Sequence, residues 1–140
     1  MNRKTLLTLL CGLAILGILL SLYLVKHHYD KEEGFCDVNS MFSCSTVNRS
    51  DYATFFHIPV ATFGVLWFLV LLGFSIQSLQ KKGERRILFW SILGILSVLY
   101  FVYAEVQLKA ICLWCTSVHF LVLFSFLLAI LLYRKKSHLP

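Results

Sequence analysis

Two cysteines near the end of the chain form a C-x-x-C sequence, Cys112-Leu113-Trp114-Cys115. Thiols at this spacing on a helix share one face, roughly 4.5 Å apart along the axis, and can close a small disulfide. Cys112 falls near the first turn of the last apolar segment, where unpaired N–H groups stabilise an anionic sulfur. The spacing therefore indicates a redox-active pair in which Cys115 is the deeper member.

A second pair, Cys36 and Cys44, lies in the only long polar segment, residues 26–57. If this segment and the C-x-x-C sequence face the same side of a membrane, the four sulfurs form two redox couples within reach of each other. The separation of the second pair predicts a mobile loop that can visit both a soluble partner and the membrane surface. The fifth cysteine, Cys11, is interpreted as a small apolar packing residue.

Other chemistries of cysteine fit the sequence less well. Four cysteines with His57 or His119 could hold zinc, but zinc sites usually combine two closely spaced pairs, and Cys36 and Cys44 are too far apart; no metal is expected. Haem attachment requires histidine where Thr116 stands. Two purely structural disulfides remain an alternative, although they do not explain a pair placed beside a helix N-terminus.

The composition places these cysteines in an integral membrane protein. The chain has 140 residues, of which 59% are hydrophobic and 14% charged, and the charges gather between long apolar segments. Four segments, 5–25, 58–79, 87–108 and 110–133, approach the roughly 20 residues that a helix needs to span a bilayer. The first lacks a small-x-small cleavage site, so we expect it to be retained. The sequence predicts a single all-α domain, a four-transmembrane-helix bundle.

Basic residues indicate how the four helices are oriented. In such a bundle nine basic residues fall on the side of the termini, and four fall on the other side. The terminal side has Arg3, Lys4, Lys81, Lys82, Arg85, Arg86, Arg134, Lys135 and Lys136, and the opposite side has Lys26, Lys31, Arg49 and Lys109. The positive-inside rule predicts cytoplasmic termini and an extracytoplasmic loop 26–57, where disulfides persist. The net charge of +6 is a topology signal, and no nucleic-acid partner is expected.

The long loop has room for structure of its own. Ser50 or Asp51 is a candidate cap of a short interfacial helix that would place Tyr52, Phe55 and Phe56 on one face. Such a helix would lie along the membrane surface and cover a site beneath it. A simple aromatic anchor is the alternative.

Aromatic residues near Cys115 could enclose a flat ring. His119, four residues past Cys115, continues the same helix face and could donate a hydrogen bond or a proton to a reactant. The candidate ring-binding residues are His119, Phe55, Phe56, Phe63, Trp67 and Trp114. Each could instead serve only in packing. Glu105, near the outer end of the third segment, could transfer protons or simply reach water.

Several short motifs together resemble the bacterial members of the vitamin K epoxide reductase family. They extend over about residues 36–122 and comprise Cys36-x7-Cys44-Ser45, Tyr52-Ala53, Ile58-Pro59-Val60-Ala61 with Gly64, Tyr100-x2-Tyr103 and Ile111-Cys112-Leu113-Trp114-Cys115. In the other well-known family of quinone-linked disulfide oxidases the C-x-x-C sequence comes in the first external loop. The order of the pairs in this chain favours the former family.

The resemblance implies an electron relay in a bacterial plasma membrane. A reduced thioredoxin-like partner, acting in trans, would exchange with the Cys36–Cys44 disulfide, Cys44 would attack Cys112, and Cys115 would face a quinone. Ubiquinone, menaquinone or a vitamin K type quinone would be the cofactor. Many relatives have tyrosine at the position of His119, so a different side chain would hold the quinone carbonyl in this chain.

A non-enzymatic small membrane protein, such as a transporter subunit or an assembly factor with two structural disulfides, is the alternative function. A transporter is expected to carry a charged residue near mid-membrane, and the centres of the four segments have none. An oxidase should lose activity when any one of its four reactive cysteines is replaced.

Overall fold

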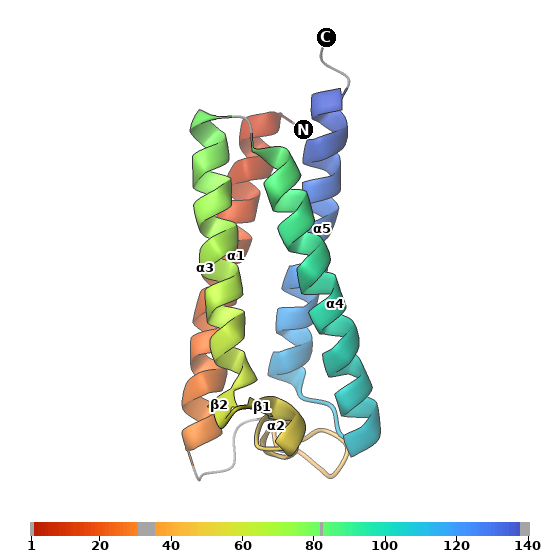
Figure 1. The fold of residues 1–140 in the computed structure, drawn as a ribbon. Coiled ribbons are helices and arrows are strands. Elements are labelled where there is room, and N and C mark those ends of the chain that lie inside the picture. The colour runs from red at the N-terminus through yellow and green to blue at the C-terminus, as the bar shows by residue number, and fades with distance from the viewer. Residues whose placement is uncertain (1, 31–35, 82, 138–140) are drawn as a thin grey trace.

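The computed structural model describes residues 2–30, 36–81 and 83–137. Four long helices form the body of the described structure: α1 (Arg3–Tyr29), α3 (Val60–Gln80), α4 (Glu84–Leu108) and α5 (Leu113–Ser137). Each is long and apolar enough to cross a membrane, which confirms the predicted all-α membrane bundle. Figure 1 shows both termini at one end of the bundle and the short elements at the other.

Polar contacts close the end of the bundle where the termini lie. Asn2 caps α1 by accepting a hydrogen bond from the Arg3 backbone N–H at 2.7 Å. The Arg3 guanidinium pairs with the buried Glu84 carboxylate at 2.9 Å and also donates to the Ser78 carbonyl. These contacts fix the start of α1 against the α3–α4 hairpin.

Gly17 allows α1 and α3 to approach closely. A Cβ atom at this position would lie 2.4 Å from Cε1 of Phe68, which is only 1% exposed and packed in the core. We expect Gly17→Ala to lower the free energy of unfolding by about 1–3 kcal/mol, because overpacking forces buried side chains from their rotamers. The unfolding midpoint in detergent measures the loss. Gly12→Ala is the matched control, since a Cβ added there would meet no neighbouring atom of the described chain within 4 Å; equal losses in both variants would contradict the prediction.

The loop between α1 and α3 contains four short elements: α2 (Cys44–Asn48), a 3-10 helix η1 (Asp51–Ala53), and strands β1 (Thr54–Phe55) and β2 (Ile58–Pro59). The strands pair antiparallel as a hairpin. Its two turn residues, Phe56 and His57, have positive φ angles of 50° and 64°.

The predicted interfacial helix over Tyr52–Phe56 is therefore wrong in detail. Only the single turn η1 forms there, and the Ser50 hydroxyl donates to the Val47 carbonyl at 2.8 Å instead of capping it. Left-handed backbone at Phe56 and His57 turns the chain into the hairpin. The helix of this loop lies earlier, at α2, because the Ser43 hydroxyl caps it by accepting from the Thr46 N–H at 3.2 Å.

Candidate redox site

Cys112 occupies the cap position of α5. Its carbonyl accepts hydrogen bonds from the Thr116 N–H at 2.8 Å and the Thr116 hydroxyl at 2.9 Å. Its sulfur accepts from the Cys115 N–H at 3.1 Å, as the side chain of a helix cap does. The helix begins at Leu113, so Cys112 lies one residue outside the first turn, and the end of the helix directs an N–H group at its sulfur.

The sulfurs of Cys36, Cys44 and Cys112 lie together. Cys36 and Cys44 form a disulfide with Cα atoms 5.6 Å apart, and Cys44 Sγ lies 3.2 Å from Cys112 Sγ. The three ligand atoms of the cluster are all within 4.8 Å of one another. Atoms about 3–3.5 Å apart are close enough to react. The arrangement therefore suits an exchange in which Cys44 gives up its bond to Cys36 and forms a bond to Cys112.

The same cluster is poorly suited to a metal in this oxidation state. Metal ligation requires thiolates, and two of the three sulfurs share a disulfide. Among the described residues neither histidine considered for zinc joins the group: His57 is exposed on the hairpin turn, and His119 is buried in the bundle.

Backbone hydrogen bonds dock the cysteine loop onto the segment before α5. The Ile111 N–H donates to the Met41 carbonyl at 2.7 Å, and the Ser43 N–H donates to the Ile111 carbonyl at 3.2 Å. Cys36 is 3% exposed and Cys44 is fully buried. The predicted mobile pair is therefore a docked pair in this structure, because these bonds join the loop to the C-x-x-C segment.

Two polar side chains that the sequence analysis missed hold this loop. Asp37 accepts hydrogen bonds from the Ser43 hydroxyl at 2.7 Å and from the Ser45 N–H and hydroxyl at 2.9 and 2.6 Å. The buried Asn48 amide donates to the Leu24 carbonyl of α1 at 2.9 Å. The sequence contained a signal for the structure of this loop. Asp37 directly follows Cys36, and Ser43 and Thr46 form a Ser-x-x-Thr cap sequence around Cys44.

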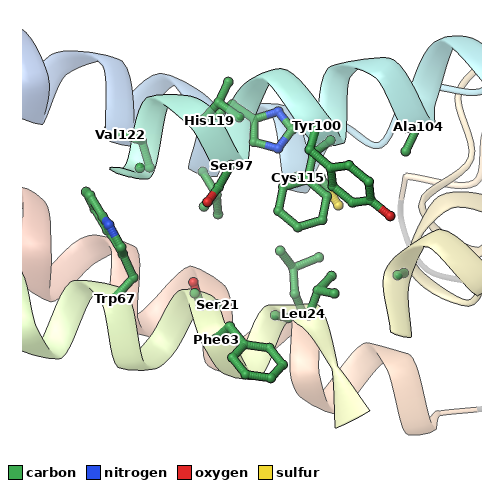
Figure 2. A pocket seen from close by; sticks show the side chains of 18 of the residues that line it. Ser21, Leu24, Phe63, Trp67, Ser97, Tyr100, Ala104, Cys115, His119 and Val122 are labelled. Carbon is green, nitrogen blue, oxygen red and sulfur yellow. The ribbon is translucent and has the colours of Figure 1, made fainter. Parts of the chain in front are cut away.

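Beside the sulfur cluster, between the four long helices, lies a cavity of about 770 Å³. All four long helices and the loop elements α2, η1 and β1 line it, and the Cys115 side chain reaches it. Figure 2 shows Cys115, His119 and Tyr100 on one side of the cavity and Ser21, Leu24 and Trp67 on the other. The cavity walls are mostly apolar and aromatic, which suits a flat hydrophobic ring.

The cavity includes four of the six predicted ring-binding residues: Phe55, Phe63, Trp67 and His119. The other two lie elsewhere. Phe56 is 83% exposed at the hairpin turn, and the Trp114 ring packs on the Tyr23 ring with centroids 5.2 Å apart. Both were predicted from aromatic character and helical spacing, whereas the positive φ at Phe56 and the direction of Trp114 depend on tertiary contacts.

Two aromatic contacts define the cavity wall more closely. The His119 ring stacks on Phe101 with centroids 6.0 Å apart and an interplanar angle of 11°. Trp67 and Trp90 exchange hydrogen bonds, each indole N–H donating to the other's backbone carbonyl at 3.3 and 3.0 Å. These bonds join α3 to α4 beside the cavity, and both tryptophans line it.

Glu105 links the cysteines to the cavity. It is 9% exposed near the end of α4, and its Oε1 accepts a hydrogen bond from the Cys112 backbone N–H at 3.2 Å. The same residue lines the cavity. The left-handed conformation of Lys109 ends α4 and turns the chain back, which brings Glu105 beside Cys112.

The chain matches the model of a known protein family. The family model described as the vitamin K epoxide reductase family matches residues 8–130, which is most of the chain. The matched range contains all four cysteines of the two pairs.

Proposed function

Because this chain belongs to the vitamin K epoxide reductase family, it is a membrane thiol–disulfide oxidoreductase, and we propose that it oxidises a thioredoxin-like protein and reduces a membrane quinone. The observation that carries the proposal is the separation of 3.2 Å between Cys44 Sγ and Cys112 Sγ, next to the cavity that Cys115 lines. The activity would support disulfide formation in other proteins.

The relay proceeds by a series of four thiol–disulfide exchanges. The thiolate of the partner attacks Cys36 and breaks the Cys36–Cys44 bond, which releases Cys44 as a thiolate. Cys44 then attacks Cys112 of an oxidised Cys112–Cys115 pair, so that a Cys44–Cys112 bond forms and Cys115 leaves as a thiolate in the cavity. The second thiol of the partner frees Cys36, and Cys36 displaces Cys112 from Cys44. One disulfide in the partner and one dithiol at the cavity result.

The cavity residues fit a quinone. Phe55, Phe63 and Trp67 would contact its ring, and His119 would hold a carbonyl oxygen. A bound quinone accepts two electrons and two protons, and thereby lets Cys112 and Cys115 return to the disulfide. The chain's part is to keep water out and to hold the Cys115 sulfur against the ring.

The proposed topology places the cysteine end outside the cytoplasm. Basic residues of the described chain support it by their distribution between the two ends of the bundle. The terminal end has Arg3, Lys4, Lys81, Arg85, Arg86, Arg134 and Lys135, and the cysteine end has Lys26, Arg49 and Lys109. Lys31, Lys82 and the side chain of Lys136 lie outside the described residues.

Access for the partner requires a local opening. Cys36 is 3% exposed, so a protein thiol reaches it only when the loop around it moves. Local openings of this kind cost less than global unfolding. Such an opening would break the hydrogen bonds between the loop and residue 111, which tie the loop backbone to the start of α5.

The direct test uses purified protein in detergent, reduced thioredoxin and a short-chain ubiquinone or menaquinone. We expect one quinone reduced for each thioredoxin disulfide formed, followed by quinone absorbance and by thiol titration. Absence of quinone consumption with both quinones would reject the proposed function. Two structural disulfides, the alternative, would give protein that oxidises no thioredoxin at all.

Cys11→Ala is expected to retain the wild-type rate within about twofold, as surface and packing substitutions distant from a site usually do. Cys11 lies in α1, half-buried, and is neither in the sulfur cluster nor in the cavity lining of the described chain. The same quinone assay measures it. A large loss would mean that a fifth sulfur takes part in the relay.

A further inference from the structure

The proposed reaction leaves one proton without a route. Closing the Cys112–Cys115 disulfide breaks two S–H bonds, forms one S–S bond and transfers two electrons to the quinone, which also takes up two protons. Cys115 lines the cavity and can release its proton there. Cys112 is fully buried and does not line the cavity, so its proton needs a carrier.

Glu105 is placed to be that carrier. Its carboxylate is hydrogen-bonded at 3.2 Å to the backbone N–H of Cys112, the residue that must lose the proton. The same side chain lines the cavity where the proton is needed. One carboxyl group therefore contacts the residue that loses the proton and also lines the site that takes it up, which are the two places a proton carrier must reach.

Other titratable groups also face the cavity, but only Cys115 among them contacts Cys112 in the described chain, and Cys115 is itself one of the two thiols that must lose a proton. These groups are Cys115 and His119 of α5, Tyr100 of α4 and Tyr52 of η1. Glu105 is the one carboxylate among the lining residues of the described chain. Glu105 and His119 are of the side-chain types that most often act as general acids and bases, and of the two only Glu105 is hydrogen-bonded to Cys112 in the described chain.

We propose that Glu105 is the proton carrier between the Cys112 thiol and the quinone cavity. As the disulfide closes, the carboxylate takes the proton from Cys112 and then passes it to an oxygen of the reduced quinone. In the next cycle Cys112 and Cys115 leave as thiolates and regain the two protons that oxidation of the partner dithiol releases. The inference rests on the proposed function and adds a residue to it.

Glu105→Gln separates this role from positioning, since the amide oxygen still accepts the Cys112 N–H but the side chain no longer exchanges a proton. We expect quinone reduction to slow by about 10²-fold or more, the usual contribution of a general acid or base, with an altered pH profile. Formation of the Cys44–Cys112 disulfide, measured without quinone in the Cys115→Ala background, should stay within about twofold. Glu105→Asp should recover part of the rate.

Infrared difference spectra between the dithiol and disulfide states supply a readout that needs no quinone turnover. The wild-type protein should show a carboxylic C=O band that shifts in D₂O and that is absent in Glu105→Gln. Gln107→Ala is the matched control, since it alters an exposed amide two residues away and should leave rate and spectrum unchanged.

The outcomes are distinct. A wild-type rate and pH profile in Glu105→Gln, or a carboxyl band that persists in this variant, would overturn the proton role while the proposed function stands. Equal losses in disulfide exchange and in quinone reduction would also overturn it and would leave Glu105 a positioning residue. A wild-type protein that reduces no quinone would reject the proposed function itself.

Discussion

Cys115→Ala is expected to accumulate a Cys44–Cys112 disulfide and to reduce quinone at least about 10³-fold more slowly than the wild type, as removal of an essential reactive residue does. The sulfur of Cys112 lies 3.2 Å from Cys44 Sγ, so the Cys112 thiolate can attack the Cys36–Cys44 bond. The new bond forms as Cys36 leaves, and no external oxidant is needed. Without Cys115 no thiol on the cavity side can attack Cys112 and break the Cys44–Cys112 disulfide.

The measurement is mass spectrometry of peptides after free thiols are blocked under denaturing, non-reducing conditions. Cys112→Ala is the matched control, because it lacks the attacking sulfur and should show only the Cys36–Cys44 disulfide. If the Cys115→Ala protein also holds only that disulfide, or reduces quinone at the wild-type rate, the relay from the outer to the inner pair is wrong.

Cys44→Ala is expected to slow oxidation of the thioredoxin-like partner by at least about 10³-fold. Exchange between Cys44 and Cys112 is intramolecular, and well-oriented intramolecular reactions have effective molarities of about 10⁵ M or more. Without Cys44 the partner would have to attack Cys112 directly, although that residue is fully buried beneath the loop. Partner oxidation by the purified variant, with quinone in excess, measures the loss.

In this variant the Cys112–Cys115 disulfide should stay oxidised even when reduced partner is in excess, because electrons no longer reach it. The wild-type protein under the same conditions should become reduced at this pair. If the variant is reduced as fast as the wild type, electrons enter at Cys112 without passing through Cys44, and the docked loop has no part in the relay.

Much of the architecture depends on short stretches of sequence and could therefore be predicted from the sequence. A helix that crosses lipid must satisfy every backbone hydrogen bond internally, so about 20 apolar residues in a row suffice to predict one. The four spans, the C-x-x-C pair at the start of the last one and the family all follow from such local patterns. The predicted bundle and family are confirmed.

The site itself depended on contacts between distant segments. Cys44 and Cys112 are separated by 68 positions, and the bonds that bring them together run between the backbones of Met41, Ser43 and Ile111. Backbone groups are the same in every residue, so such docking leaves no signature in side-chain types. For this reason the sequence suggested a mobile loop where the structure has a buried one.

The cavity also combines features that the sequence predicted with features that depend on tertiary contacts. Aromatic residues near Cys115 predicted that a flat ring could be held there, but Phe56 and Trp114 do not line the cavity, whereas Tyr100 and Phe101 do. The sequence by itself determined the helices, their apolar surfaces and the cysteine chemistry, because these depend on neighbours along the chain. The tertiary structure alone decided which side chains face one another, including the contact of Glu105 with Cys112, because helix rotation and loop docking are set by packing between segments.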